Sequence, residues 1–351
     1  MHKGNFDPNA TGNTGNNIFG LPFSVAESEI VIIPVPWEVT VSNFGGTAKG
    51  PSNVLENSYQ IDFFDPVNPE GWKKGFAMEP IDLQWVKRNN DIREVSQSYI
   101  KSLDDGQDPG TNASLAAMQQ QINDACEALC QSIESKALKY LHINQTPIIL
   151  GGDHSVPLGL IRALAKKMPG FGILQIDAHA DLRNQYQGLW HSHASIMHNA
   201  LAIKGVEKLV QVGIRELCPE EQNYIANNPD KITTHYDHAV RQRIFEGESW
   251  AALCREIVSD LPQCVYLSFD VDGLEPALCP GTGTPLPGGL SYQEAMYLLK
   301  TVVESGRSII GADLVETGQG SIDGIVSSRL LFRIAGLVQF SRKQTSGINN
   351  P

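Results

Sequence analysis

Short apolar runs alternate with longer segments of helical periodicity along most of the chain. The runs predict buried strands at residues 29–37, 147–150, 172–177, 209–214, 264–270 and 309–316. Apolar positions at helical spacing predict helices from residue 52, at 113–139, from 155 to 167, up to 202, and at 219–227, 249–260, 291–304 and 325–340. Continuous apolar strands that alternate with helices predict an α/β protein with a parallel sheet covered on both faces.

Two segments depart from this alternation. Residues 1–25 show no periodicity, and we expect an N-terminal arm that is flexible or wraps the surface. Residues 62–111 are rich in Asp, Pro and Gly and predict a partly helical insertion. Because the composition does not shift after residue 25, residues 26–351 predict one domain.

Composition and charge exclude several classes of function. The net charge of −12 and the pI near 5.2 argue against nucleic acid and anionic membranes as partners. No apolar run reaches membrane-spanning length, and the polar N-terminus does not resemble a signal peptide. The glycine-rich residues 45–51 lack the spacing of a phosphate-binding loop. The six cysteines form no CxxC pair, which indicates reduced thiols and a cytoplasmic location.

Metal-binding side chain types follow four of the apolar runs. They are His154, Asp177, His179, Asp181, Asp270, Asp272 and Glu316. Residues two apart in extended chain point to the same side, and the carboxyl ends of parallel strands form one rim where ligands bind. Carboxylates and imidazoles brought together there repel and desolvate one another unless a cation lies between them.

The composition of this set indicates which cations it binds. Histidine with aspartate and no thiolate suits two divalent ions of Mn, Ni, Zn or Fe rather than Ca or Mg. A water that bridges two such ions becomes hydroxide at neutral pH and attacks a planar carbon. The sequence therefore predicts a dinuclear hydrolytic centre.

Five motifs extend along the chain in a fixed order. They are Gly-Gly-Asp-His-Ser at 151–155, Asp-Ala-His-Ala-Asp at 177–181, Ser-Phe-Asp-Val-Asp-Gly at 268–273, Pro-Gly-Thr-Gly-Thr-Pro at 280–285 and Gly-Ala-Asp-Leu-Val-Glu at 311–316. They resemble the motifs of the ureohydrolases, the arginase and agmatinase family, and the resemblance covers residues 29–340. It implies a three-layer α/β/α fold, a homotrimer or homohexamer, and the hydrolysis of a guanidino group to urea and an amine.

The resemblance also implies roles for individual residues. One metal would be held by His154, Asp177, Asp181 and Asp270, and the other by Asp177, His179, Asp270 and Asp272. Asp181 is also counted among the catalytic residues. His193 matches the histidine that shuttles protons in the family, and Glu316 matches the carboxylate that pairs with the planar guanidinium. Each subunit would bind two Ni²⁺ or Mn²⁺ ions, and accessory proteins that load the metal are possible partners.

Four other polar residues near the motifs receive structural interpretations. His191 and His198 match no ligand position and are interpreted as structural or pocket-lining. Asp153 precedes a ligand and is expected to support it. Asp313 lies within a strand, where we expect it to satisfy a backbone group.

The substrate is predicted from the loop at residues 182–191. This loop resembles agmatinase-type sequences and lacks the Asn- and Ser/Thr-rich character of arginases. Trp190 and His191 are bulky and precede His193, so we expect them to contact the substrate and shorten its pocket. Residues 36–42 and the long N-terminal region resemble the nickel-dependent branch that hydrolyses free guanidine. Free guanidine is therefore the leading expectation, ahead of agmatine and guanidino acids.

Two interpretations of another kind compete with this one. A catalytically inactive homologue that serves as a binding subunit is disfavoured because every expected ligand is present. A metal-dependent deacetylase on a related fold is disfavoured because the Asp270–Asp272 pair and two histidines suit a dinuclear site better.

Overall fold

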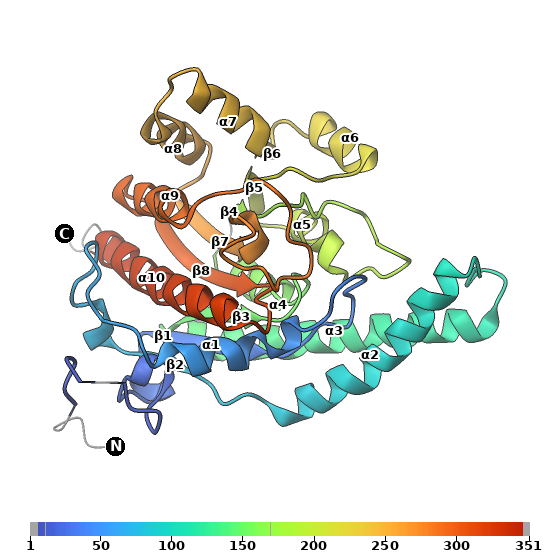
Figure 1. Cartoon of the computed structure of the whole chain (residues 1–351), viewed down its shortest axis with the longest axis horizontal. Helices are drawn as coiled ribbons and strands as arrows, with labels where there is room; N and C mark the ends of the chain where they lie inside the picture. Colours follow the sequence, from blue (N-terminus) through green and yellow to red (C-terminus); the bar gives the residue numbers. More distant parts are fainter. Residues whose placement is uncertain (1–5, 11, 169, 347–351) are drawn as a thin grey trace.

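An eight-stranded parallel sheet organises the computed structural model, which describes residues 6–10, 12–168 and 170–346 (Figure 1). The strands are β1 (Ile30–Val35), β2 (Phe76–Met78), β3 (Thr146–Gly151), β4 (Phe171–Ile176), β5 (Val206–Val212), β6 (Ile232–His235), β7 (Cys264–Asp270) and β8 (Ser308–Val315). Their order across the sheet is β2-β1-β3-β8-β7-β4-β5-β6, and each neighbouring pair is parallel. The predicted parallel sheet is confirmed.

Helices cover both faces of the sheet, as predicted for a three-layer fold. They are α1 (Gly50–Ser58), α2 (Leu83–Asp104), α3 (Ala113–His142), α4 (Leu158–Lys167), α5 (Ile196–Leu201), α6 (Pro219–Asn227), α7 (Asp237–Phe245), α8 (Trp250–Ser259), α9 (Tyr292–Glu304) and α10 (Ser321–Ser346). In the described part of the chain, the buried hydrophobic side chains form two cores, one with α1, α8, α9 and α10 and the other with α2 to α6.

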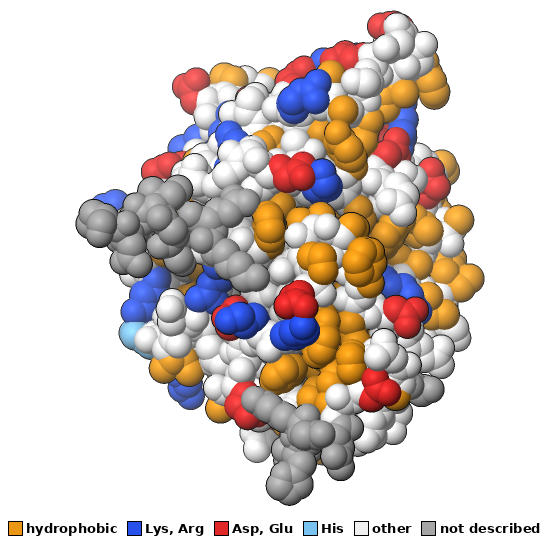
Figure 2. Space-filling model, turned by 90° about the vertical axis from the view of Figure 1, so that its left-hand side faces the viewer, with side chains coloured by type: hydrophobic (Ala, Val, Ile, Leu, Met, Phe, Trp, Pro, Cys, Tyr) orange, Lys and Arg blue, Asp and Glu red, His pale blue; other side chains and the backbone are white. Residues whose placement is uncertain are grey.

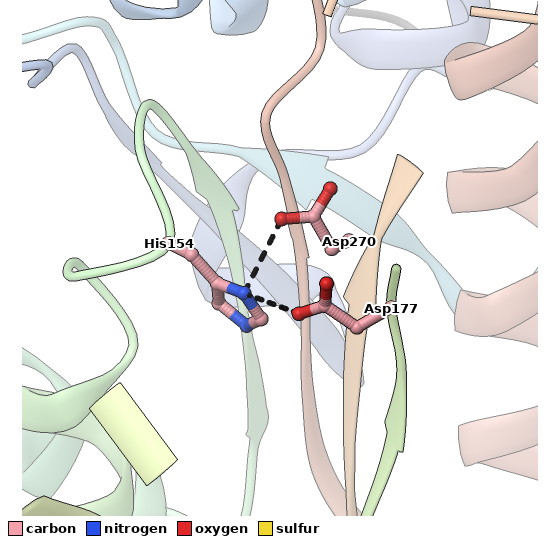
Figure 3. Close-up of side chains that lie close together, drawn as sticks. All are labelled: His154, Asp177 and Asp270. Carbon is pink, nitrogen blue, oxygen red and sulfur yellow. Dashed lines mark ion pairs between the residues drawn. The ribbon is translucent and has the colours of Figure 1, made fainter. Parts of the chain in front are cut away.

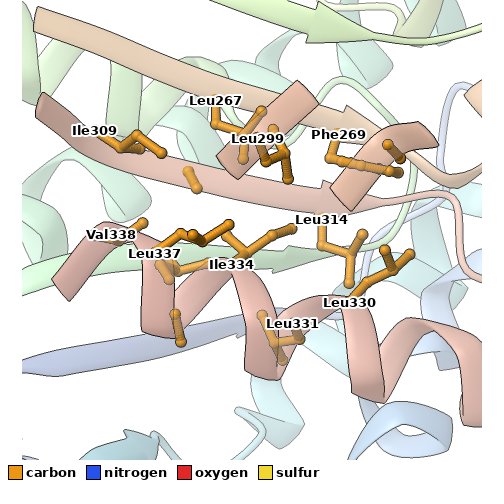
Figure 4. Close-up of a cluster of buried hydrophobic side chains, with 14 of the residues drawn as sticks. Leu267, Phe269, Leu299, Ile309, Leu314, Leu330, Leu331, Ile334, Leu337 and Val338 are labelled. Carbon is orange, nitrogen blue, oxygen red and sulfur yellow. The ribbon is translucent and has the colours of Figure 1, made fainter. Parts of the chain in front are cut away.

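The packing of α9 and α10 against the sheet shows how the layers are held together. Leu299 of α9 and Leu330 of α10 are fully buried near Phe269 of β7 and Leu314 of β8 (Figure 4). Burying a leucine or phenylalanine side chain stabilises a fold by about 1.5–3 kcal/mol. Strands buried on both faces need continuous apolar sequence, which is why the apolar runs predicted them.

The N-terminal arm is partly integrated into the core. Residues 18–21 are fully buried, and the Phe19 ring packs edge-on against Phe76 and Phe332, with centroid distances of 6.4 and 5.2 Å. This part of the predicted arm is therefore neither flexible nor wrapped over the surface. Residues 1–5 and 11 of the arm lie outside the described residues.

The predicted insertion at 62–111 contains regular structure. It supplies β2, which extends the sheet beside β1, and α2, which packs on α3. The two helices form a hairpin that projects from the rest of the molecule (Figure 1). The helix predicted from 155 to 167 begins at Leu158 as α4, and the Ser155 hydroxyl donates to Asp153 in the turn before it.

The surface carries charges of both signs. Figure 2 shows hydrophobic side chains interspersed with basic and acidic ones on the face that lies at the left of Figure 1. Among the described helices, none is both long and apolar enough to cross a bilayer.

The chain segments that directly follow β1 and β3 approach each other closely. The Asp153 amide donates to the Trp37 carbonyl at 2.8 Å, and a β-carbon at Gly152 would lie 1.8 Å from that same oxygen. Backbone on both sides leaves no flexible atom that could move aside. The segment that carries His154 is thereby fixed against the first strand.

We expect Gly152→Ala to lower the free energy of unfolding by about 3 kcal/mol or more, because the methyl group overlaps backbone. Gly336→Ala is the control, since a β-carbon there meets nothing closer than Asp65 Oδ2 at 3.7 Å and alanine favours helix by up to about 1 kcal/mol. Chemical denaturation followed by circular dichroism measures both. Equal stability of the two variants would contradict this account of residue 152.

Candidate active site

A cleft with a cavity of about 290 Å³ lies at the carboxyl ends of β3, β8, β7 and β4, which are adjacent in the sheet. Of the residues predicted from the sequence, its lining includes His154, His179, Asp181, His193, Asp270, Asp272 and Glu316. Asp177 is fully buried beside them. The strand order thus brings the predicted carboxylates and imidazoles together.

The first group of metal-binding atoms centres on His154. Its Nδ1 lies 2.9 Å from Asp177 Oδ2, 3.0 Å from Asp181 Oδ2 and 3.2 Å from Asp270 Oδ2. Figure 3 shows His154, Asp177 and Asp270 pointing toward one another from three chain segments. All four side chains are buried. Four ligand atoms therefore converge on one point.

The second group shares Asp177 with the first. His179 Nδ1 lies 3.1 Å from Asp272 Oδ2 and 3.6 Å from Asp177 Oδ1. Atoms of Asp177, His179 and Asp272 lie within 4.8 Å of one another, as do those of His154, Asp177 and Asp270. Each oxygen of Asp177 thus faces one group, which is the arrangement of a carboxylate that bridges two ions.

Backbone groups orient these carboxylates. Asp177 Oδ1 accepts from the His179 amide at 2.6 Å, Asp270 Oδ1 from the Asp272 amide at 2.9 Å, and Asp272 Oδ1 from the Ala178 amide at 3.0 Å. The Ala178 amide of the loop after β4 thus holds Asp272 of the loop after β7, and the other two amides act within one loop. The second oxygen of each carboxylate lies within 3.2 Å of His154 or His179.

Two site residues adopt left-handed backbone conformations. Asp181 has φ 55° and Glu316 has φ 61°. Such a conformation costs about 1–3 kcal/mol in a residue other than glycine, and it persists only where surrounding contacts enforce it. The strained conformation therefore occurs at two positions whose side chains line the cleft.

Burial and mutual repulsion shift the pKa values of the carboxylates. Burial, together with the negative charge of Asp177, raises the pKa of Asp181 to about 7. Burial and the charges of Asp272 and Asp177 raise the pKa of Asp270 well above its usual value. A carboxylate that resists ionisation here lacks a compensating positive charge.

The histidines respond in the opposite direction. Burial alone would lower the pKa of His179, but the Asp272 and Asp177 carboxylates raise it to about 12. Burial likewise opposes the charge on His154, yet its three carboxylate neighbours raise its pKa well above the usual value. A positive charge would therefore be favoured within each of the two groups of metal-binding atoms, and their carboxylate oxygens and imidazole nitrogens suit two divalent cations.

Further polar groups hold His154 from behind. Its Nε2 lies 2.9 Å from Ser268 Oγ, which donates to Asp313 Oδ1 at 3.2 Å. Asp313 also accepts from the Phe269 amide at 3.1 Å, so it serves the site as well as the backbone group that we expected it to satisfy. Such outer partners fix the orientation of a metal-binding imidazole.

His193 lies in the cleft and interacts with Thr40. Burial and the neighbouring His179 lower the pKa of His193 to about 4, so the ring is neutral at neutral pH. Thr40 Oγ1 lies 3.0 Å from Asp153 Oδ2, to which it donates, and 3.2 Å from His193 Nδ1. Because the hydroxyl proton is given to Asp153, we assign the ring proton to Nδ1, which leaves Nε2 as an acceptor.

Glu316 lies beside the first group. Its Oε1 accepts from the His154 amide at 2.9 Å, and its side chain is buried at the cleft wall. Burial and the charge of Asp153 raise the pKa of Glu316 well above its usual value. A cation in the cleft would therefore be favoured next to this carboxyl group.

Trp190 and His191 do not line the cleft. Trp190 is 63% exposed, and its backbone amide donates to Asn123 Oδ1 at 3.1 Å. His191 Nε2 lies 3.0 Å from Glu127 Oε2 on α3. The expectation that these two side chains shorten the pocket is therefore wrong, because neither of them lines it. His198 packs against Tyr224, with ring centroids 5.2 Å apart.

Sequence reasoning missed a buried chain of amides behind Asp177. Thr234 Oγ1 donates to Gln211 Oε1 at 2.7 Å, Gln211 Nε2 to Gln175 Oε1 at 2.6 Å, and Gln175 Nε2 to Asp177 Oδ2 at 2.8 Å. The signal was a glutamine within each of two apolar strands. A polar residue at a fully buried position needs a partner.

Comparisons with known proteins agree with this geometry. The family model described as the Arginase family matches residues 28–319. The chain is 29% identical to N(1)-aminopropylagmatine ureohydrolase of Thermus thermophilus over 89% of its length and 90% of the relative. It is 29% identical to an agmatinase of Bacillus anthracis, covering 84% of each chain. The structure of proclavaminate amidino hydrolase from Streptomyces clavuligerus matches with a TM-score of 0.69 and 21% identity, covering 93% of this chain and 97% of that one, which supports the fold.

We expect Asp177→Asn to abolish the binding of both ions, because Asp177 belongs to both groups. Asp272→Asn belongs to one group and should leave about one ion per subunit. Metal content after gel filtration, measured by inductively coupled plasma mass spectrometry, distinguishes the two. Retention of about one ion per subunit by Asp177→Asn would show that Asp177 is not shared.

We also expect the affinity for Mn²⁺ to rise with pH. A cation binds the ionised carboxylate, and the pKa of Asp181 is raised to about 7, so the proton of Asp181 competes below that pH. His154 and His179, whose pKa values are also raised, must release their protons as well, so the affinity should increase by about tenfold or more per pH unit between pH 6 and 8 and continue to rise above pH 8. Isothermal titration calorimetry in buffers of different ionisation enthalpy would also detect the released protons, and a flat pH profile would contradict the prediction.

Proposed function

The chain belongs to the arginase family, and from that premise we propose that it hydrolyses an alkylguanidine to urea and an amine. The observation that carries the proposal is the cleft itself. It combines two metal-binding groups that share Asp177, the buried carboxyl of Glu316 and a neutral His193. The carboxyl group suits the guanidinium of the substrate, the metal-binding groups suit activation of a water, and the neutral histidine suits proton transfer to the departing amine.

Glu316 binds and orients the guanidinium. Its Oε1 is held by the His154 amide, which fixes the carboxyl plane relative to the first group. A carboxylate matches the planar donors of a guanidinium, and the positive charge of the substrate favours the ionised form of Glu316. The central carbon is thereby directed toward the ligands of both groups.

When bound, the two divalent ions supply Lewis acidity and lower the pKa of bound water. Asp177, Asp270 and Asp272 keep fixed orientations through backbone amides, so the ligand geometry does not have to rearrange during the reaction. His154 is fixed in the same way by Ser268.

His193 moves the proton. Its Nδ1 is bonded to Thr40, and Nε2 is the atom free to accept a proton and pass it to the leaving nitrogen. The carbon–nitrogen bond then breaks, the amine departs with that proton, and the oxygen from water remains in urea. A ring whose pKa is about 4 releases the proton readily.

The outer part of the cleft favours a substrate with a cationic tail. Trp190 does not line the cleft, but Glu216 does. The Glu216 side chain is 61% exposed, and its Oε2 lies 3.6 Å from His179 Nε2. A primary ammonium group at the end of an aliphatic chain complements this carboxylate. The relatives named above, an aminopropylagmatine ureohydrolase and an agmatinase, carry names that denote substrates of this type. We therefore propose agmatine or a related aminoalkylguanidine.

Free guanidine is the second candidate. The resemblance of residues 36–42 to the guanidine-hydrolysing branch favours it, and Val41 and Ser42 of that segment line the cleft. Either Mn²⁺ or Ni²⁺ suits the imidazole and carboxylate ligands. Assembly into a trimer or hexamer and the action of metal-loading proteins stay predictions.

The test is urea release by protein loaded separately with Mn²⁺ and Ni²⁺ and offered agmatine, free guanidine, arginine and guanidinobutyrate. We expect the highest kcat/KM for agmatine, a loss of at least about a hundredfold in Glu316→Gln, and no change in Trp190→Ala, whose side chain lies outside the cleft.

Other outcomes revise the proposal in distinct ways. A preference for free guanidine that Trp190→Ala abolishes would mean that Trp190 closes the cleft when substrate binds. No urea from any compound with two ions bound would contradict the proposed reaction. No urea and no bound metal would favour the inactive binding homologue.

A further inference from the structure

The two sides of the cleft are formed by chain segments without regular secondary structure. The Thr40 wall comprises residues 38–43, of which Val41, Ser42 and Asn43 line the cavity. The Tyr186 wall comprises residues 182–193, of which Arg183, Tyr186 and His193 line it. Because neither wall has helix or strand hydrogen bonds over most of its length, other contacts must fix its shape.

Helix α2 binds the backbone of the Thr40 wall. Ser96 Oγ donates to the Val39 carbonyl at 2.6 Å, and both groups are buried. Asn89 Oδ1 accepts from the Glu38 amide at 2.8 Å, and Arg93 Nη1 donates to the Val39 carbonyl at 3.3 Å. Three residues on one side of α2 thus satisfy the polar backbone of this wall.

The same hairpin binds the tip of the Tyr186 wall. Tyr99 of α2 is fully buried, and its hydroxyl donates to the Gln187 carbonyl at 2.8 Å. From α3, Gln119 Nε2 donates to the Gly188 carbonyl at 3.1 Å and Asn123 Nδ2 donates to it at 3.3 Å. The wall turns sharply here, with φ 54° at Gln187 and 75° at Gly188.

The turn and the helix fit one another closely. A β-carbon at Gly188 would lie 1.8 Å from Gln119 Nε2, so a larger residue would displace the Gln119 amide from the Gly188 carbonyl. The two walls meet at the cleft, where the His193 amide donates to Thr40 Oγ1 at 3.1 Å. The hairpin therefore contacts both walls from outside, and the walls contact each other inside.

We propose that the α2–α3 hairpin sets the width of the cleft and thereby its substrate specificity, with Ser96, Tyr99 and Gln119 as positioning residues. None of the three lines the cavity, so each acts through the wall that it binds. This assigns a role to the α2 part of the insertion. The predicted change in substrate specificity rests on the proposed function, whereas the statement that the hairpin holds the two walls does not depend on catalysis.

The chain offers matched controls on the same helices. Ser98 lies two residues after Ser96, and its hydroxyl bonds to the Glu94 carbonyl on the exposed side of α2. Gln120 follows Gln119, and its amide bonds to Asp124 on the exposed side of α3. Ser98→Ala and Gln120→Ala therefore remove the same chemical groups without touching either wall.

We expect Ser96→Ala and Gln119→Ala to raise KM for agmatine and to lower the ratio of kcat/KM for agmatine to that for free guanidine by about three- to tenfold, the effect of one lost hydrogen bond. Agmatine carries an aliphatic tail that contacts both walls, whereas free guanidine contacts only the part of the cleft beside the metal-binding residues. Tyr99→Phe should behave likewise. The two controls should stay within twofold of wild type, and metal content should remain the same in all variants.

Hydrogen–deuterium exchange gives a readout without catalysis. Peptides that cover residues 183–191 should exchange several times faster in Gln119→Ala than in Gln120→Ala. Equal specificity and equal exchange in each matched pair would overturn the inference. If wild-type protein releases no urea, the proposed function fails, and the exchange experiment alone then decides whether the hairpin holds the walls.

Discussion

Several carboxylates are buried together at the carboxyl ends of four adjacent strands, and the positive charge needed to stabilise them is the constraint on which the rest of the structure depends. Asp177, Asp181, Asp270, Asp272 and Glu316 are all nearly excluded from water within one cleft. Desolvation and repulsion between such groups would normally oppose folding. Cations that offset this cost couple metal binding to the stability of the fold.

The architecture around the site follows from that constraint. The sheet places its central strands so that their loops meet, and two of these loops donate a backbone amide to a carboxylate of another, Ala178 to Asp272 and His154 to Glu316. A buried row of glutamines behind Asp177 reaches as far as the edge strand β6. Orientation of the ligands is therefore distributed over elements that are distant in sequence, and substitutions far from the cleft can reach it.

The strands of six or more residues could be predicted from their apolar runs, whereas the short strands β2 and β6 could not. The apolar run at 172–177 identifies β4, whereas β6 was missed because only Ile232 is buried in it. The metal-binding residues could be located because strand ends in a parallel sheet share one rim. The exposure of Trp190 could not, since the loop that carries it passes through a left-handed turn at 187–188, which the sequence shows only as Gln-Gly. Thr40 carried no signal at all, because its role depends on Asp153 and His193, which are more than a hundred residues away.

The left-handed conformations of Asp181 and Glu316 have a consequence for protein engineering. At these positions glycine, and to a lesser degree asparagine, would relieve backbone strain and a buried charge at once. A library selected only for thermal tolerance in the absence of metal is therefore expected to enrich such replacements and to discard the cleft chemistry. Directed evolution of this scaffold needs a selection for turnover or metal retention from the first round.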